Sequence, residues 1–231
     1  MGIKIFNFWQ NFQLGGKTYT VWFPPDLGEA PPGMNPLAYR AGLERGHYFR
    51  KGDPVIKMKV NAGDHLFVDR LTYNFRKPER GEIVVFATGG VPEEHRVNPP
   101  FWNIPADQFY IKRLVGLGGE TIQIGEDRHL LINGKRLDAG TPHFENIYSF
   151  PPKSRPEPSQ FSGHVSQPQM PFFPDSSRIY RIPDGHVMVM GDNTMNSLDS
   201  RYWGDFPETS VIGKAFFVYW PFSDRFGWGT R

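Results

Sequence analysis

The chain has 231 residues, of which 26 are Lys or Arg and 24 are Asp or Glu, so its formal net charge is +2. It contains no cysteine, which excludes disulfides, cysteine nucleophiles, thiolate zinc sites and iron–sulfur clusters. Aromatic residues make up 15% of the chain, as is typical of folded proteins, and the nearly balanced charge creates no field that attracts nucleic acid. We therefore expect a folded protein without a nucleic-acid partner.

Short β-branched and aromatic runs alternate with turn residues along a chain that holds 25 glycines and 22 prolines. This pattern predicts a mainly β protein with few short helices. In chain order, the predicted strands are Val55–Val60, His65–Asp69, Glu82–Phe86, Phe109–Val115, Thr121–Ile124, Leu130–Ile132, Arg178–Ile182, His186–Met190 and Val211–Trp220. Asn133-Gly134 predicts a tight hairpin, because both central residues of that turn need a positive φ, and Pro183-Asp184-Gly185 predicts a second turn.

Two proline-rich stretches, Phe23–Pro36 and Phe150–Pro174, have no regular apolar face and are expected to be exposed loops. The longest apolar run, Ala215–Trp220, is much shorter than the ~20 residues that a helix needs to cross a bilayer. No export signal is visible after Met1. The sequence as given therefore predicts neither a membrane-spanning helix nor a leader.

Lys112 lies on a predicted strand next to a second cation, Arg113. Because side chains alternate along a strand, Lys112 shares a face with Tyr110 and Leu114, whereas Arg113 points the other way. If the face of Lys112 is buried, the loss of hydration lowers the pKa of its amine, and a neutral amine can act as a general base. The alternative is a solvated lysine on an edge strand.

A polar loop follows the apolar strand His186–Met190, and it gathers Asp192, Ser197, Asp199 and Arg201 within a few residues. Either aspartate could pair with Arg201, and Ser197 could offer its oxygen to a lysine amine. The alternative interpretation is a structural polar turn, in which side chains bond to the loop backbone.

No metal site is predicted, because no pair of the seven histidines has a metal-ligand spacing. Gly116-Leu117-Gly118-Gly119 follows a strand but lacks the Lys-Ser/Thr of a phosphate loop, so we interpret it as a turn.

Four segments together resemble the successive motifs of bacterial type I signal peptidases. They are Gly63–Arg70, Arg80–Phe86, Tyr110–Gly116 and Gly191–Gly204, and they occur in the order of that family. The resemblance covers residues 61 to 222, apart from the insertion at 150–177. It implies a mostly β, membrane-anchored endopeptidase with a Ser/Lys dyad, which removes signal peptides from exported preproteins on the outer side of the cytoplasmic membrane.

By position, the resemblance implies that Lys112 is the general base and that Ser197 orients it. Asp192, Asp199 and Arg201 match residues that support the site, and Arg113 is structural. The reaction needs no cofactor and no metal. The implied partners are the signal peptides of exported preproteins and the lipid of the cytoplasmic membrane.

The resemblance also suggests a domain organisation. Residues 1–50 form an N-terminal region before the core, and residues 51–118 form the first part of the catalytic core, which includes the strand with the base. Residues 119–185 form an inserted β-rich subdomain with the second proline-rich loop, and residues 186–231 form the second part of the core.

The sequence departs from the family at the nucleophile, because the Ser-Met-x-Pro-Thr segment upstream of Gly63 is missing and the first serine is Ser149. One hypothesis is that the record is truncated, so that the chain as given is inactive and the full-length protein supplies the anchor and the serine. The second is a catalytically inactive relative that binds extended peptides at a sheet edge. A third is that Ser197 itself is the nucleophile, although its position suits orientation of the amine.

Aromatic residues are frequent near the end of the chain. The aromatic residues between Phe216 and Phe222 could form a rim that faces a membrane, but the alternating ones among them are expected to pack in the core. Phe226 and Trp228 are better candidates for contact with lipid.

Overall fold

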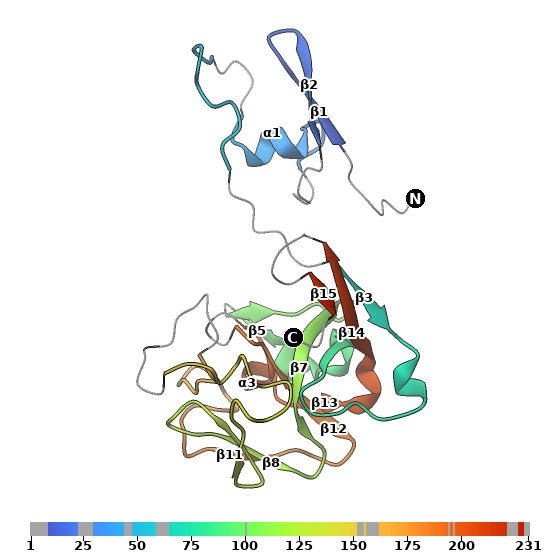
Figure 1. Ribbon diagram of the computed structural model, residues 1–231, viewed down its shortest axis with the longest axis vertical. Coiled ribbons are helices and arrows are strands. Elements are labelled where there is room, and N and C mark those ends of the chain that lie inside the picture. Colours follow the sequence, from blue (N-terminus) through green and yellow to red (C-terminus); the bar gives the residue numbers. More distant parts are fainter. Residues whose placement is uncertain are drawn as a thin grey trace. The chain divides into compact units, whose positions relative to one another are not determined.

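In the computed structural model, the described residues are 9–22, 30–43, 48–58, 65–99, 101–151, 155, 162–193, 195, 197–220 and 226–228. The chain divides into two compact units, Met1–Asp64 and His65–Arg231. Figure 1 shows the elements of both units along the chain. In the described part, no helix is both long and apolar enough to cross a membrane.

The first unit contains an antiparallel hairpin and one short helix. Strands β1 (Trp9–Leu14) and β2 (Lys17–Trp22) pair from Trp9↔Trp22 to Leu14↔Lys17. Gly15 and Gly16 connect them with φ values of 57° and 75°, which explains why two glycines stand at this turn. We did not predict this hairpin. Helix α1 (Pro36–Arg40) begins after Asn35, whose side chain accepts hydrogen bonds from two backbone N–H groups of its first turn.

The predicted strand Val55–Val60 is wrong over residues 55–58, which form no strand, and residues 59 and 60 lie outside the described part. The predicted alternation is partly kept, since Lys57 is exposed while Ile56 and Met58 are half-buried. Alternation alone does not make a strand, because the backbone also needs a neighbouring strand for its hydrogen bonds.

The second unit is built on a seven-stranded antiparallel sheet with the order β13-β12-β7-β4-β14-β15, in which β3 also pairs with β14. Its strands are β3 (His65–Asp69), β4 (Ile83–Ala87), β7 (Phe109–Leu117), β12 (His186–Met190), β13 (Phe206–Pro207), β14 (Val211–Trp220) and β15 (Gly227–Trp228). A second sheet has the order β10-β9-β8-β11, with β8 (Thr121–Ile124), β9 (Leu130–Ile132), β10 (Lys135–Arg136) and β11 (Ile179–Arg181). Strands β5 (Val97–Asn98) and β6 (Trp102–Asn103) form a separate hairpin.

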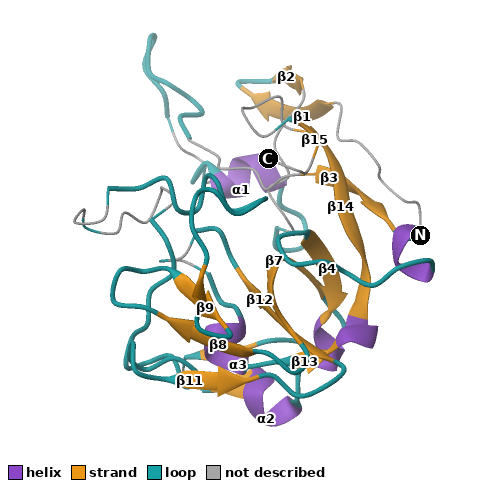
Figure 2. Ribbon diagram, turned by 60° about the horizontal axis from the view of Figure 1, so that its bottom comes forward, coloured by secondary structure: helices purple, strands orange, loops and turns teal. Residues whose placement is uncertain are grey.

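The helices of this unit are short: α2 (Glu93–Arg96), α3 (Ser200–Trp203) and the 3₁₀ turns η1 (Thr72–Asn74), η2 (Thr88–Gly90) and η3 (Glu208–Ser210). Figure 2 shows how strongly strands dominate. The prediction of a mainly β protein is confirmed. The predicted Asn133-Gly134 hairpin is confirmed as well, with φ values of 51° and 76°.

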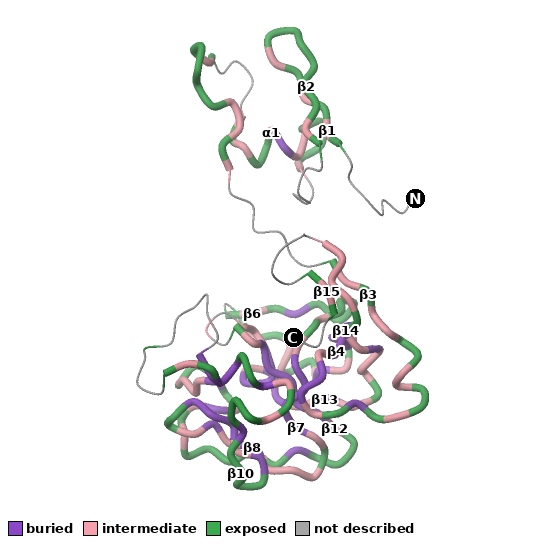
Figure 3. The backbone as a smooth tube through the Cα atoms, viewed as in Figure 1, coloured by how far each residue is buried: buried purple, intermediate pink, exposed green. Residues whose placement is uncertain are grey.

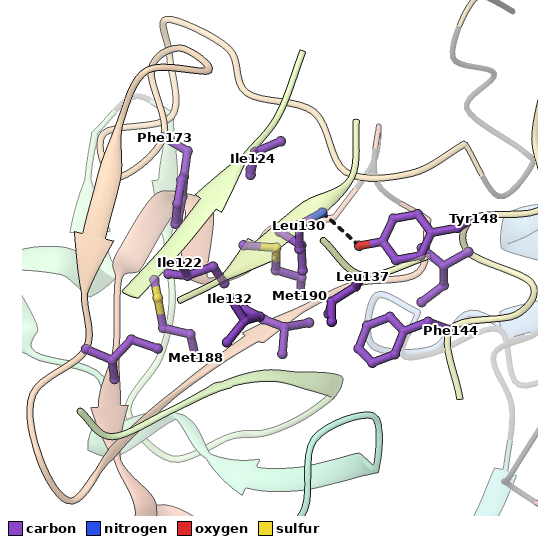
Figure 4. Close-up of a cluster of buried hydrophobic side chains, with 13 residues drawn as sticks. Ile122, Ile124, Leu130, Ile132, Leu137, Phe144, Tyr148, Phe173, Met188 and Met190 are labelled. Atoms are coloured by element: carbon purple, nitrogen blue, oxygen red, sulfur yellow. Dashed lines mark hydrogen bonds between the residues drawn. The ribbon is translucent and has the colours of Figure 1, made fainter. Parts of the chain in front are cut away.

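Strand β12 separates two clusters of buried side chains. Val187 and Val189 pack in one cluster with Leu114, whereas Met188 and Met190 pack in the other with Val115. Both faces of β12 are therefore buried, which explains why its sequence is apolar at consecutive positions and does not alternate with polar residues. Figure 3 shows the buried stretches around β7 and β12, and Figure 4 shows the cluster beneath the second sheet, with the hydrogen bond from the Leu130 N–H to the Tyr148 hydroxyl.

The second proline-rich stretch is not simply an exposed loop. Residues 152–154 and 156–161 lie outside the described part, but His164, Met170 and Phe173 are buried. Phe173 belongs to the cluster beneath the second sheet. The expectation of exposure was wrong here because composition indicates irregular backbone and does not reveal that single apolar residues of such a segment fill a core.

Candidate active site

Lys112 lies on an interior strand. Strand β7 pairs with β4 on one side, where Lys112 faces Val84, and with β12 on the other. On the same face as Lys112, Tyr110 and Leu114 pack in a core cluster. The alternative of a solvated lysine on an edge strand is therefore wrong.

The side chain of Lys112 is half-buried, and its Nζ lies 5.9 Å from the centre of the Tyr110 ring. Burial lowers the pKa of the Lys112 amine, the charge of Asp199 opposes this shift, and the charge of Arg201 adds to it. Within the described part of the chain, Nζ has no hydrogen-bond or ion-pair partner. Lys112 is therefore a partly buried lysine whose amine is less basic than an exposed one.

Asp199 and Arg201 form a fully buried ion pair behind the loop. Nε of Arg201 donates to Oδ1 of Asp199 at 2.8 Å, and Nη2 donates to Oδ2 at 2.8 Å. Oδ2 also accepts the N–H of Gly191 at 2.9 Å, so the pair holds the point where the chain leaves β12. Burial alone would raise the pKa of Asp199, but the charge and hydrogen bonds of Arg201 lower it. Of the two aspartates, it is thus Asp199 that pairs with Arg201.

Asp192 pairs instead with Arg113, the neighbour of Lys112. Nε and Nη2 of Arg113 donate to the two carboxylate oxygens at 2.8 and 2.7 Å, and Nη1 donates to the Gly81 carbonyl at 2.7 Å. This bidentate contact links the loop to β7. Arg113 is therefore a structural residue of the site, as the resemblance implied.

Ser197 packs against the start of the same loop. A Cβ built on Gly191 would lie 2.0 Å from the Ser197 Oγ, so the two residues are in close contact. The register of β7 and β12 pairs Met190 with Arg113, the neighbour of Lys112, and Gly191 follows Met190 directly in the chain. The Ser197 Oγ is buried and has no hydrogen-bond partner among the described residues, so the expected bond between Ser197 and Lys112 is not formed here.

Comparison with known proteins decides the family. A family model described as signal peptidase, peptidase S26, matches residues 43–220. The chain belongs to this family. The resemblance to type I signal peptidases is thereby confirmed, and all five candidate residues lie inside the matched region.

The relatives of this signal peptidase family member carry related names. Over an aligned stretch of 185 residues, the chain is 31% identical to the probable signal peptidase I-2 of Synechocystis. This stretch makes up 80% of this chain and 67% of that protein. Over 185 aligned residues, the chain is 30% identical to the signal peptidase I of Leptolyngbya laminosa, and the alignment makes up 80% of this chain and 73% of that protein. A solved signal peptidase I from Enterococcus faecalis is 26% identical and covers 60% of this chain and 97% of that chain, with a TM-score of 0.39.

The structure adds features that the sequence reasoning missed. A pocket of about 440 Å³ opens beside Ser197, between the β5–β6 hairpin and the loop. The second feature is the close contact of Gly191 with Ser197. The sequence hinted at it by placing a glycine directly between a buried strand and a polar loop. Among the described residues, no group of three or more His, Asp and Glu side chains could hold a metal ion.

Proposed function

We propose that this chain is the base-bearing part of a signal peptidase I that cleaves signal peptides from exported preproteins through a Ser/Lys dyad. The observation that carries this proposal is the half-buried amine of Lys112, which has no partner among the described residues and whose pKa is lowered by burial. The charges of Asp199, Arg201 and Asp192, in the loop that also carries Ser197, act on this amine. Membership of the signal peptidase family gives the reaction class.

In the proposed reaction, the neutral amine of Lys112 removes the proton from a serine hydroxyl as its oxygen attacks the scissile carbonyl carbon. The resulting ammonium then protonates the departing amine as the C–N bond breaks, which leaves an ester between the serine and the signal peptide. Lys112 next removes a proton from water as the water oxygen attacks the ester carbonyl carbon, and the resulting ammonium returns that proton to the serine oxygen as the ester C–O bond breaks. Lys112 therefore transfers one proton in each half-reaction and ends neutral.

We propose that Ser197 orients the amine. A buried hydroxyl without a partner costs about 1 to 3 kcal/mol, so both the hydroxyl and the unpaired Nζ gain by bonding to each other. Catalytic hydrogen bonds are often long in an unliganded site and tighten when substrate binds. Asp199 with Arg201, and Asp192 with Arg113, hold the loop that carries Ser197.

The nucleophile is proposed to lie outside these 231 residues, because the first serine of the chain is Ser149. A preceding segment would bring the serine and the membrane anchor, and the 231 residues alone would then cleave nothing. The competing function is that of an inactive relative that binds signal peptides, and the missing serine is the observation that favours it. A role of Ser197 as nucleophile would leave Lys112 without a hydroxyl to orient it.

We also propose that the site works at the outer surface of the cytoplasmic membrane. Phe67, Phe216 and Trp228 are exposed on β3, β14 and β15, which are neighbours in the sheet (Figure 1), and Phe226 precedes β15. Aromatic side chains favour the interface between lipid and water.

The test starts from the full reading frame upstream of Met1. The protein encoded by that frame is purified and mixed with a preprotein whose signal peptide ends in Ala-Xaa-Ala. We expect cleavage after that motif, a loss of about 10²- to 10⁴-fold in kcat/KM for Lys112→Ala, and no cleavage by residues 1–231 alone. Lys135→Ala, which changes an exposed lysine on β10, serves as the matched control.

Three results would contradict the proposal. Cleavage that Lys112→Ala leaves unchanged would remove the base from the mechanism. Binding of the preprotein by the full-length protein without any cleavage would favour the inactive relative. Cleavage by residues 1–231 that Ser197→Ala abolishes would instead identify Ser197 as the nucleophile.

A further inference from the structure

The pocket beside Ser197 has walls from three separate parts of the chain, one of which contributes Gln169. Phe101 and Trp102 come from the β5–β6 hairpin, and Leu198 and Tyr202 come from the loop and from α3. The volume of about 440 Å³ lies within the ~300 to 1,000 Å³ of ordinary ligand sites. It suits a short piece of peptide with its side chain.

The walls are held in place by contacts outside the pocket. The indole N–H of Trp102 donates to the carbonyl of His95 at 3.0 Å, and the ring packs edge-on against Tyr202 at 5.3 Å between ring centres. Asn98 pairs with Trp102 across the hairpin. Nε of Arg96 donates to the Val91 carbonyl at 2.9 Å, which fixes the start of the hairpin. The pocket is therefore formed before any ligand binds.

The lining is apolar and uncharged. Its largest side chains are aromatic or aliphatic, its polar members include Asn98, Gln169 and Ser197, and none of the lining residues that the structure describes is Asp, Glu, Lys or Arg. A charged side chain would lose its hydration in this pocket without finding a counter-ion, whereas an apolar side chain gains from burial. The lining thus selects against charge.

Ser197 belongs both to this pocket and to the candidate active site. A side chain in the pocket must then come from a residue near the bond that the enzyme cleaves. We propose that this pocket binds one large apolar side chain, aliphatic or aromatic, of the preprotein segment next to the scissile bond. This inference rests on the proposed function and names a determinant of its substrate specificity.

The experiment measures binding of synthetic peptides by fluorescence anisotropy to the full-length protein with Lys112→Ala, which is expected not to cleave them. Each labelled peptide has an apolar run, Ala-Xaa-Ala and a short following segment, and one position at a time is Leu, Phe or Lys. At one position we expect Leu and Phe to bind about tenfold more tightly than Lys. Phe101→Ala, which removes a wall, and Met195→Trp, which fills the pocket, should each reduce that preference about fivefold.

Phe75→Ala is the matched control, because Phe75 is also exposed but lies next to η1 and does not line the pocket. A second measurement places a benzophenone side chain at the selected position of the peptide and maps the photochemical cross-link by mass spectrometry. We expect the cross-link at residues 98–102, at Gln169 or at residues 195–202.

The outcomes separate this inference from the proposed function. A position preference that Phe101→Ala and Phe75→Ala change equally, or a cross-link to none of these lining segments, overturns the pocket assignment even when cleavage depends on Lys112. Cleavage that is independent of Lys112 overturns the proposed function, whereas a cross-link to one of these lining segments with a Phe101-dependent preference still supports the pocket.

Discussion

Gly191 and Ser197 are in such close contact that a Cβ on Gly191 would lie 2.0 Å from the Oγ of Ser197 and 2.5 Å from its Cβ. Both distances are below any normal contact between heavy atoms, and the second atom belongs to the stem of a side chain, which has little freedom to move away. The site therefore depends on the absence of a side chain at residue 191.

Gly191→Ala is expected to displace Ser197. It should lower stability by about 1 to 3 kcal/mol through overpacking and reduce kcat/KM of the full-length protein about 10- to 100-fold. The double variant with Ser197→Gly removes the collision, so we expect it to regain stability but not activity. Gly140→Ala is the control, because its added Cβ would meet only the end of the Asp138 side chain at 3.2 Å. Equal urea midpoints for Gly191→Ala and the unchanged protein would show that the fold accommodates a Cβ at residue 191 without loss of stability.

Lys112 is expected to cost stability at neutral pH. Its pKa in the folded protein is lowered by burial from the ordinary value of 10.5, so protonation favours the unfolded state. Lys112→Met should therefore raise the melting temperature below the folded-state pKa of the lysine, and this gain should shrink as the pH rises toward 10.5.

The comparison uses thermal unfolding of both proteins from neutral to alkaline pH. Lys135→Met, on the exposed part of β10, is expected to show no such trend. A melting temperature of Lys112→Met that is lower than that of the unchanged protein at neutral pH would mean that the amine is solvated or paired in solution.

The ion pair of Asp199 and Arg201 is expected to be among the most sensitive places in the fold, because both side chains are fully buried. Asp199→Asn leaves the buried guanidinium without its carboxylate and should cost about 3 to 5 kcal/mol. Replacement of both residues by apolar ones, Asp199→Leu with Arg201→Met, should cost less than that. Glu208→Gln, which breaks the 3.1 Å pair with the exposed Lys77, should cost about 1 kcal/mol or less. If urea unfolding showed a similar loss of unfolding free energy for Asp199→Asn and Glu208→Gln, the buried ion pair would be no more sensitive than the exposed one, against this prediction.

Glu82 is expected to make the fold sensitive to acid. Burial alone would raise the pKa of Glu82, but hydrogen bonds from Arg76 and Lys214 lower it from 4.5 to about 2. Its folded-state pKa is depressed, so its stabilisation is complete above pH 4.5 and is lost as the pH falls toward 2.

Glu82→Gln should therefore lower stability by about 2 to 3 kcal/mol at neutral pH, and the difference from the unchanged protein should decrease below pH 4.5. Urea unfolding at several acid pH values measures this, with Glu79→Gln as an exposed control in the same loop. If the stability of Glu82→Gln and that of the unchanged protein fell in parallel through this pH range, the Glu82 carboxylate would not be the cause of the acid sensitivity.

The strands with strong local patterns were predictable. Thr121–Ile124, Leu130–Ile132, His186–Met190 and Val211–Trp220 have in the structure the bounds that their apolar runs indicated. The alternation around Lys112 also predicted correctly that Tyr110 and Leu114 share a face. Local order of this kind depends on periodicity, which is present in the sequence itself.

Other features depended on partners that are distant in the chain. Residues 55–58 alternate but form no strand, and His164 and Phe173 of a proline-rich stretch are buried. The sequence placed Asp192 and Asp199 together near Arg201 but could not say that Asp192 pairs with Arg113. That choice depends on which strand β12 joins.

The sequence by itself therefore determined the fold class, the family and the group of residues around Lys112, because each is encoded in residue types and spacing over short stretches. The tertiary structure alone decided that β7 is an interior strand, that Ser197 rests on Gly191 and that a pocket lies between the β5–β6 hairpin and α3. These properties arise from contacts between segments up to about a hundred residues apart, and such contacts leave no periodic signal in the chain.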